Sequence, residues 1–217
     1  ISPQTLWDTA LPPFEMGVKA GAATVMSAFN DISGVPASAN RYTMTDILRG
    51  MWGFDGLVVS DWDAVKQLVA QGVAADRAEA AAKAITAGLD MDMVDDVYRE
   101  NLEALVESGR VPEKVLDEAV RRILRVKFRL GLFEKPYIEE LPDEQRYLSI
   151  EARAAARELA AESMVLLKNS GATLPVAGDV RRIALMGPMA DNRADLMGSW
   201  WGQGEAGDVV TILEGVK

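Results

Sequence analysis

The chain has 217 residues, 49% hydrophobic and 26% charged, which is enough for one large or two small globular domains. Its net charge of -10 argues against nucleic acid as a partner, because phosphate binding needs clustered Lys and Arg. With no Cys and no His, disulfides, thiolate chemistry and Cys-based zinc sites are excluded, and acid–base chemistry falls to Asp and Glu.

The amino-terminal segment is predicted to be helical over residues 3–19, with Ser2 as the N-cap and Pro3 at the first helical position. Pro12 and Pro13 must start or kink a segment there. The first residues lack the basic and apolar regions of a signal peptide, and no initiator Met precedes them, so we expect the chain to begin within a domain. No apolar run approaches the roughly 20 residues of a membrane-spanning helix, so we expect no membrane partner.

Three short apolar segments then alternate with helical segments. Strands are predicted over residues 23–29, 57–60 and 89–94, and helices over residues 43–51 and 64–87. The run at 57–59 has the pattern of a strand buried on both faces. Strands separated by helices predict an α/β fold with a parallel sheet and right-handed crossovers.

Two further helices are predicted, over residues 98–107 and from residue 112 to Gly131. Residues 134–147 contain two prolines and five acidic residues, which is typical of an exposed linker. Beyond it, residues 151–168 are predicted to form a helix and residues 182–186 a new strand.

A capping box begins a last predicted helix near the end of the chain. Thr211 is followed three residues later by Glu214, the spacing at which each side chain bonds the other residue's backbone. The chain then stops within the helix, so we expect it to continue in a longer protein.

Asp61 is the candidate catalytic residue. It follows the apolar run at residues 57–59, in the segment Ser60-Asp61-Trp62-Asp63. The carboxyl end of a strand in a parallel α/β fold is where ligands bind and catalytic side chains project. The alternative is an Asp that merely bonds the backbone amides that follow it.

A family resemblance supports the catalytic interpretation. Residues 58–62 (VVSDW), preceded by residues 51–56 (MWGFDG), resemble the nucleophile segment of family 3 glycoside hydrolases, above all the bacterial periplasmic β-glucosidases. These enzymes have a (β/α)8 TIM-type barrel followed by an α/β sandwich domain. The resemblance implies that residues 1–133 are the last three β/α units of the barrel, 134–157 the interdomain linker and 158–217 the start of the sandwich.

The chemistry that the resemblance implies is that of a retaining exo-β-glycosidase, with Asp61 as nucleophile and no metal or organic cofactor. The expected substrates are β-linked gluco-oligosaccharides, and the expected location is periplasmic or secreted. The acid/base of the family lies in segments that this chain lacks: a Glu of the second domain in β-glucosidases, or an Asp–His dyad in N-acetylglucosaminidases. The remaining part of the barrel is then expected in another segment, or even in a separate chain. Whether the protein forms a homo-oligomer is left open.

Two alternatives to a β-glucosidase remain. One is a β-xylosidase of the same family. The other is a non-catalytic product, either a fragment or a half-barrel scaffold that no longer binds sugar. The presence of the remaining barrel strands in the same preparation would separate a catalytic protein from such a scaffold.

Three aromatic residues are candidate substrate contacts. Trp62 and Trp200 match positions from which relatives supply two rings that stack on the sugar, where a ring gives a large apolar contact of fixed orientation. Phe29 stands where many relatives have a Tyr whose hydroxyl lies near the nucleophile, and periplasmic relatives often have an apolar residue there. Trp201 is better interpreted as a core residue.

Five aspartates near the predicted strand ends raise the question of a calcium site. Their spacing lacks the Gly and the terminal Glu of an EF-hand loop. We therefore expect no metal site, and solvated carboxylates at the following positions: Asp63, Asp90, Asp92, Asp95 and Asp96.

Overall fold

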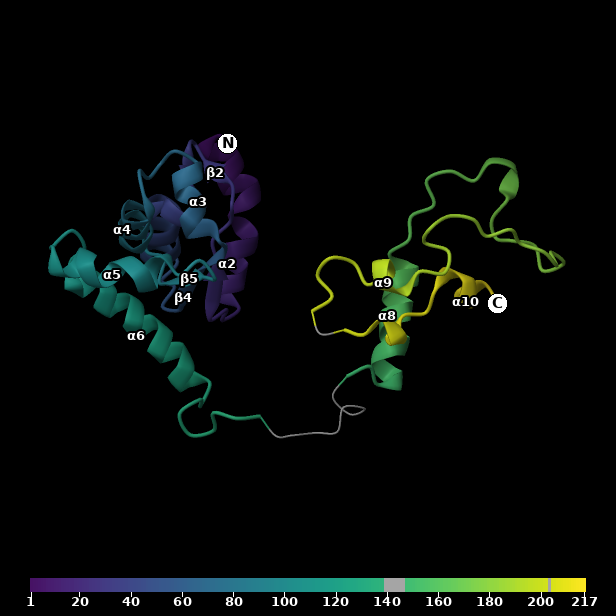
Figure 1. The fold of residues 1–217 in the computed structure, drawn as a ribbon. Coiled ribbons are helices and arrows are strands. Elements are labelled where there is room, and N and C mark those ends of the chain that lie inside the picture. Colours follow the sequence, from purple (N-terminus) through teal and green to yellow (C-terminus); the bar gives the residue numbers. More distant parts are fainter. Residues whose placement is uncertain (139–146, 203) are drawn as a thin grey trace. The chain divides into compact units, whose positions relative to one another are not determined.

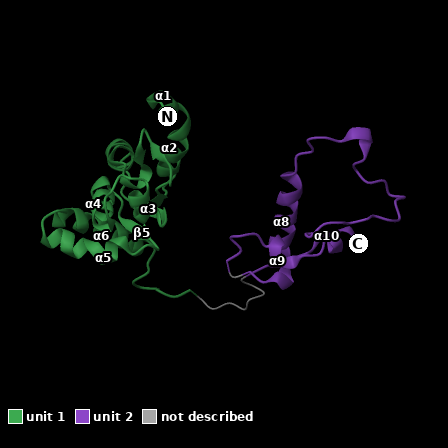
Figure 2. Cartoon of the chain, turned by 45° about the horizontal axis from the view of Figure 1, so that its top comes forward, with its two compact units in different colours: residues 1–140 green, residues 141–217 purple. Residues whose placement is uncertain are grey.

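The computed structural model describes residues 1–138, 147–202 and 204–217 (Figure 1). The chain divides into two compact units, residues 1–140 and 141–217, coloured green and purple in Figure 2. Within the described ranges, no helix combines the length and the apolar character needed to cross a membrane.

The first helical segment is broken where the prolines predict a break. It consists of α1 (Pro3–Thr5), a π-helical turn η1 (Leu6–Ala10) and α2 (Pro12–Lys19). Ser2 is the N-cap, as predicted, and its hydroxyl accepts a hydrogen bond from the Thr5 N–H at 3.1 Å. Because proline has no N–H to donate, the chain restarts its helix at Pro12.

A three-stranded parallel sheet is the centre of the first unit. Its strands are β1 (Thr24–Met26), β4 (Leu57–Trp62) and β5 (Met91–Met93), in the order β1-β4-β5. β4 is therefore the middle strand and pairs with both neighbours. The predicted α/β fold with a parallel sheet is confirmed for this unit.

Both outer strands are shorter than predicted. Residues 23–29 were expected to form a buried strand, but β1 covers three residues and Met26 is 48% exposed. β5 likewise covers three of the six residues predicted at 89–94. Each of these strands pairs with β4 on one side, so its ladder extends only as far as that partner allows.

A β-hairpin follows β1. β2 (Asp31–Ile32) and β3 (Val35–Pro36) pair in antiparallel fashion. The turn between them holds Gly34 at a φ of 82°, and its N–H donates to the Asp31 carboxylate at 3.0 Å. A short 3-10 turn, η2 (Ala37–Ala39), follows.

The remaining helices of the first unit pack beside the sheet. They are the π-helical η3 (Tyr42–Met51), α3 (Ala64–Ala70), α4 (Arg77–Ala87), α5 (Val97–Glu107) and α6 (Glu113–Arg129). The single helix expected over 64–87 is thus two helices. Asp76 caps the second of them by accepting a hydrogen bond from the Glu79 N–H at 2.8 Å.

The hydrophobic core of this unit lies between β4 and the helices that follow it. Burying apolar side chains here supplies most of the stabilisation that positions the strand ends. The fully buried apolar residues of this cluster include Val58, Val65, Leu68, Leu89 and Val97, each at 0% exposure.

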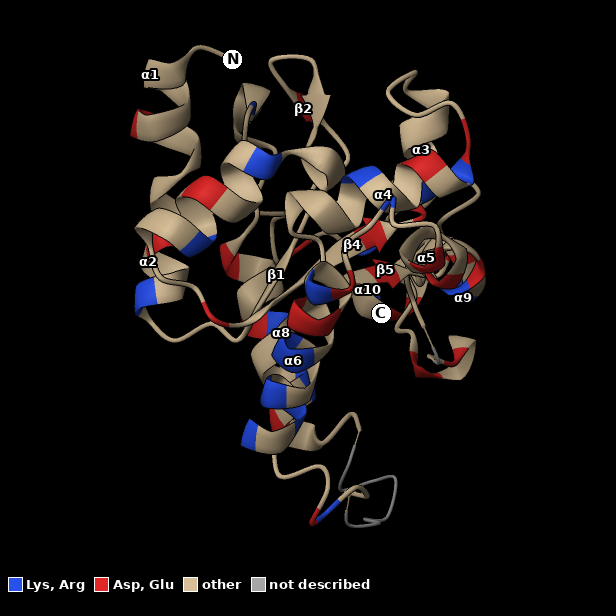
Figure 3. Cartoon of the chain, turned by 90° about the vertical axis from the view of Figure 1, so that its left-hand side faces the viewer, with Lys and Arg blue, Asp and Glu red and all other residues tan. Residues whose placement is uncertain are grey.

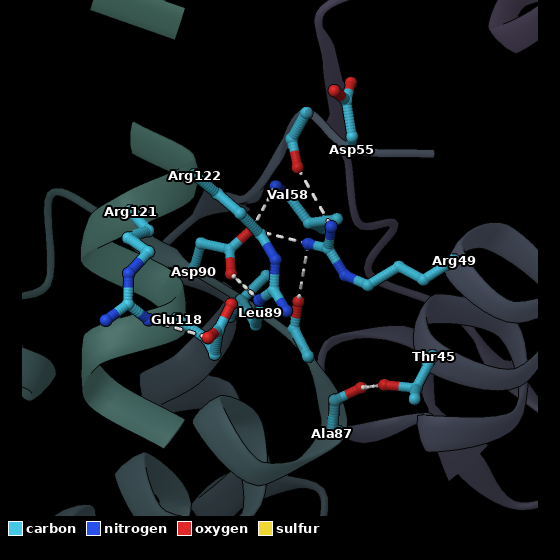
Figure 4. Close-up of polar contacts among 12 residues, drawn as sticks. Thr45, Arg49, Asp55, Val58, Ala87, Leu89, Asp90, Glu118, Arg121 and Arg122 are labelled. Atoms are coloured by element: carbon cyan, nitrogen blue, oxygen red, sulfur yellow. Dashed lines mark hydrogen bonds and ion pairs between the residues drawn. The ribbon is translucent and has the colours of Figure 1, made fainter. Parts of the chain in front are cut away.

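A buried ion-pair network joins four elements near the start of β4 and β5 (Figure 4). Asp90 is 5% exposed, and one of its carboxylate oxygens accepts from Arg49 at 2.6 Å and from the Val58 N–H at 2.8 Å. The other oxygen accepts from Arg122 of α6 at 2.8 Å. Arg49 also donates to the Gly56 carbonyl at 2.9 Å. Burial lowers the pKa of the Arg49 guanidinium, against the opposing attraction of Asp90.

Removing the central carboxylate of this network should destabilise the protein strongly. We expect Asp90→Ala to lower the free energy of unfolding by about 3–5 kcal/mol, because two partly buried guanidinium groups lose their buried counter-ion. Urea unfolding followed by circular dichroism measures this. The matched control is Asp55→Ala, which removes an exposed pair with Arg129 and should cost about 1 kcal/mol or less. Equal losses in both variants would contradict the assignment of the network to the core.

The second unit contains helices and turns among its described residues. These are α8 (Ile150–Glu162), η4 (Ser170–Ala172), α9 (Arg193–Leu196), η5 (Ala206–Asp208) and α10 (Ile212–Val216). The capping box predicted at the start of α10 is confirmed. The Thr211 N–H donates to the Glu214 carboxylate at 2.9 Å, and the Glu214 N–H donates to the Thr211 hydroxyl at 3.2 Å.

Two sequence predictions in this unit are wrong. The helix expected over residues 151–168 ends at Glu162, six residues early, with Ser163 as its C-cap. Residues 182–186 do not form a strand, and Ile183 and Met186 are 55% and 87% exposed. A strand needs a partner for its backbone hydrogen bonds, and no segment within 147–202 or 204–217 pairs with this one. Of the predicted linker at 134–147, residues 139–146 lie outside the described part of the chain.

Candidate active site

Asp61 lies near the carboxyl end of β4, the middle strand of the parallel sheet. The strand continues through Trp62, two residues beyond its predicted end at Ser60. Asp61 is partly exposed and Trp62 is 49% exposed, whereas Val58 and Ser60 on the same strand are fully buried. The apolar part of β4 thus anchors the strand in the core, and its polar end reaches the surface.

The pairing between β4 and β5 is irregular next to Asp61. Val59 pairs with Met91 and Trp62 with Met93, so β4 advances three residues while β5 advances two. The Met93 N–H donates to the Ser60 hydroxyl at 2.7 Å, and the Asp63 N–H donates to the Met93 carbonyl at 3.2 Å. Such a bulge turns side chains in new directions and is frequent beside active sites.

The carboxylate of Asp61 has a local hydrogen-bond partner. It accepts a hydrogen bond from the Trp62 N–H at 2.7 Å. This is the type of bond that the purely structural alternative requires. However, Asp61 does not cap the helix that follows. That helix, α3, receives its cap from Asp95, which accepts from the Lys66 N–H at 2.8 Å.

The other aspartates of this region hold the structure together. Asp95 is 6% exposed, and its second oxygen accepts from the Val97 N–H at 3.2 Å. Asp92 accepts from the Tyr98 N–H at 3.0 Å, so both acids serve the start of α5. Burial and a hydrogen bond with Asp95 raise the pKa of Asp92. Among the described residues, the Asp61 carboxylate accepts no such hydrogen bond from another element.

The expectation of solvated carboxylates is wrong for two of the five aspartates. Asp90 and Asp95 are buried, and each accepts hydrogen bonds from groups distant in sequence. Asp96 is exposed and forms an ion pair with Arg99, which lowers the pKa of Asp96. Across the described ranges, no three carboxylates come together in an arrangement that could hold a metal ion.

The loops that follow β4 and β5 contain backbone strain. Asp63 and Asp96 have a φ of 55°, and Val94 has a φ of 75°. Positive φ is tolerated by Asp but is costly for a β-branched residue such as Val. Strain of this kind persists only where the surrounding structure enforces it, and it clusters at functional sites.

The three aromatic candidates belong to two different units of the chain. Phe29 follows β1 and is 42% exposed, and its carbonyl accepts from the Gln71 side chain at 3.0 Å. Because β1 and β4 are neighbours in the sheet, Phe29, which follows β1, and Trp62, which ends β4, lie toward the same edge of the sheet. Trp200 belongs to the second unit and is 87% exposed. Trp201 was expected in the core but is 53% exposed, which corrects that prediction.

Charged residues are spread over both the helices and the strand ends (Figure 3). Three basic residues of α6 bind acids or carbonyls of other segments. Arg122 binds Asp90, Arg125 donates to the Asp55 carbonyl at 2.8 Å, and Arg129 pairs with the Asp55 carboxylate.

The fold and this site define an α/β protein with its candidate catalytic carboxylate at the carboxyl edge of a parallel sheet. Residues 1–126 match the model of the glycosyl hydrolase family 3 N terminal domain. The chain belongs to glycosyl hydrolase family 3.

Similar proteins agree with this assignment. The periplasmic β-glucosidase of Salmonella typhimurium is 42% identical over 100% of this chain and 29% of its own length. A putative β-xylosidase of Formosa agariphila is 38% identical over 87% of the chain and 25% of its own length. The crystal structure of a β-glucosidase from Listeria innocua in complex with glucose matches with a TM-score of 0.86 and 40% identity, over 100% of this chain and 30% of that one. The chain thus spans about a third or less of these relatives.

Proposed function

We propose that this chain is part of a retaining exo-β-glucosidase that removes terminal glucose from β-linked gluco-oligosaccharides. One observation carries the proposal. Asp61 is a partly exposed carboxylate at the carboxyl end of the middle strand. Within the described part of the chain it binds no second element of the fold, whereas its buried neighbours Asp90 and Asp95 do. The relatives named β-glucosidases support the choice of substrate.

The proposed chemistry begins with attack of the ionised Asp61 carboxylate on the anomeric carbon. The bond to the leaving oxygen breaks, and an acid supplies the proton that this oxygen takes up. Water then attacks the covalent glycosyl–enzyme, gives its proton to the same group and releases glucose with retained configuration. That second group is expected in a segment outside this chain. No metal or organic cofactor takes part.

The proposed architecture is the last part of a (β/α)8 barrel followed by the start of an α/β sandwich. Residues 1–133 would supply three β/α units, residues 134–157 the linker and residues 158–217 the sandwich. The parallel order β1-β4-β5 with intervening helices supports the barrel units. The division of the chain into units after residue 140 falls within the proposed linker. The rest of the barrel would pair with the two outer strands.

Phe29, Trp62 and Trp200 are proposed to contact the sugar. All three residues are exposed, from 42% to 87%, which supports a contact with a ligand. Phe29 follows β1 and Trp62 ends the adjacent β4, so both belong to the carboxyl edge on which Asp61 lies. A β-linked oligosaccharide presents C–H faces that pack on such rings.

Removing the two tryptophans should weaken binding of long substrates selectively. We expect Trp62→Ala and Trp200→Ala in the full-length enzyme each to cost about 1–3 kcal/mol of oligosaccharide binding, the scale of a lost aromatic anchor. KM and kcat/KM for a β-gluco-oligosaccharide and for a small aryl β-glucoside measure this. Trp201→Ala is the matched control. Equal losses on both substrates would indicate a disrupted site instead of stacking.

Two other functions remain to be tested against this one. The Formosa agariphila relative favours a β-xylosidase, and comparing kcat/KM for aryl β-xyloside and aryl β-glucoside decides between the two sugars. A non-catalytic fragment or half-barrel scaffold would hydrolyse neither.

A periplasmic or secreted location is proposed from the named Salmonella relative, and detection in the periplasmic fraction tests it. The partners proposed are the oligosaccharide and the remaining barrel segment, and a homo-oligomer is a further option.

A further inference from the structure

Ser60 occupies the irregular point where β4 and β5 lose their regular register. Its side chain is fully buried, at 0% exposure. Its hydroxyl accepts a hydrogen bond from the Met93 N–H at 2.7 Å and donates one to the Asp61 carbonyl oxygen at 2.8 Å. A single side chain thus joins the neighbouring strand to the backbone of the candidate nucleophile.

The Ser60 hydroxyl replaces a backbone carbonyl of β4 as the hydrogen-bond acceptor for β5. In a regular parallel pair, the Met93 N–H would donate to a carbonyl of β4. Here β4 carries one extra residue between its pairs at Val59 and Trp62, and the Ser60 Oγ receives this N–H instead. Only a side chain that both donates and accepts at the γ position can satisfy the Met93 N–H and the Asp61 carbonyl together. Because Ser60 is fully buried, solvent does not replace these bonds.

The direction of the Asp61 side chain depends on this bulge. Residues alternate between the two faces of a strand, and an extra residue shifts that alternation. The β4 backbone on either side is held by other groups: the Val59 carbonyl accepts from the Ser27 N–H at 2.9 Å, and the Asp63 N–H donates to Met93. Between these two fixed points, the Ser60 hydroxyl is the side-chain link that holds the Asp61 backbone.

We propose that Ser60 is a positioning residue, which holds the bulge closed and thereby aims the Asp61 carboxylate at the anomeric carbon. This inference rests on the proposed role of Asp61 as nucleophile. It concerns the chemical step, because Ser60 is buried and does not reach the sugar. Its loss should therefore affect the rate of attack and not the binding of glucose.

The test is the rate at which a 2-deoxy-2-fluoro-glucoside with a good leaving group inactivates the full-length enzyme. We expect Ser60→Ala to lower the limiting inactivation rate by about 10²-fold, the scale of a misplacement of about 1 Å. The inhibition constant of glucose should stay within a few-fold of wild type. Ser60→Thr, which keeps the hydroxyl, should restore the rate to within about tenfold. An unchanged rate in Ser60→Ala, or a parallel loss of glucose binding, would overturn the proposal.

Ser27→Ala is the matched control. Ser27 is also a buried serine that follows a strand of the same sheet, but its hydroxyl bonds Ser38 at 2.8 Å. It should leave the inactivation rate within a few-fold of wild type. If Ser60→Ala does not fold, Ser60→Cys replaces it, since a thiol fills the site but is a weak hydrogen-bond donor. Equal rates for the Cys and Thr variants would then overturn the proposal.

Mass mapping of the labelled peptide separates this inference from the function on which it rests. A wild-type label on a carboxylate other than Asp61 would refute the proposed nucleophile. A label on Asp61, with an unchanged rate in Ser60→Ala, would refute the positioning role alone.

Discussion

Replacing Asp61 by asparagine is expected to lower kcat of the full-length enzyme by several orders of magnitude and to leave its folding intact. The amide is nearly the same size as the carboxylate, and its oxygen can still accept the bond that the Trp62 N–H donates at 2.7 Å. It is, however, neutral and a poor nucleophile, so the covalent intermediate should not form. Steady-state rates on an aryl β-glucoside, together with a thermal unfolding curve, measure both parts of this prediction.

The control for this variant is Asp63→Asn, two residues further along the chain. Asp63 has a φ of 55°, a conformation that asparagine also tolerates, so the substitution adds no backbone strain. It removes one negative charge near the same strand end and should change kcat by a few-fold at most. A large loss in Asp63→Asn and a small one in Asp61→Asn would move the nucleophile. A fluoro-glucoside label on a peptide without Asp61 would have the same meaning.

The sheet and its candidate carboxylate could be predicted because local sequence carries their signals. The alternation of apolar runs with helical segments predicts parallel strands, and the polar residues after 57–59 mark a strand end. These two observations make Asp61 a candidate, and the family resemblance favours the catalytic interpretation over that of an Asp that bonds the backbone. Strand lengths could not be predicted in the same way, because they depend on pairing partners. β4 has two neighbours and reaches six residues, whereas β1 and β5 each have one and reach three.

The supporting residues of the site escape prediction for a related reason. Ser60 bonds Met93, which is 33 residues away, and Asp95 caps a helix through Lys66, which is 29 residues away. Bonds between distant loops leave no periodic pattern in the sequence. The available signal for Ser60 was a small polar residue inside an otherwise apolar strand. For Asp95, the sequence signal was its place in a group of acidic residues, which we interpreted as solvated.

The wrong prediction of a strand in the second unit has the same physical cause, a dependence on distant partners. Residues 182–186 have a good strand composition, but backbone hydrogen bonds, not composition alone, make a strand. Because their apolar side chains are exposed, these residues gain little from burial in the described structure. The capping box at Thr211, by contrast, closes within four residues and was predicted correctly.

The last expectation is that residues 1–217, expressed alone, hydrolyse no aryl β-glucoside. β1 and β5 are the two outer strands of the sheet, and each pairs with β4 on one side. Their other edges carry backbone groups that a closed barrel would pair. Helix α6 also presents an apolar face, with Val120, Leu124 and Phe128 at 45%, 39% and 59% exposure. These features favour association with a further segment or aggregation.

The proposed reaction also predicts that residues 1–217 are inactive on their own. Asp61 can attack, but the proposed acid/base and the sugar-binding loops of the earlier strands belong to segments outside these residues, so the leaving oxygen would receive no proton. The measurement is turnover of an aryl β-glucoside by the purified 217-residue chain, with the full-length enzyme at the same molar concentration for comparison. Size-exclusion chromatography reports whether the chain associates. Sustained turnover that Asp61→Asn abolishes would contradict this expectation, because it would show that these residues complete an active site by themselves.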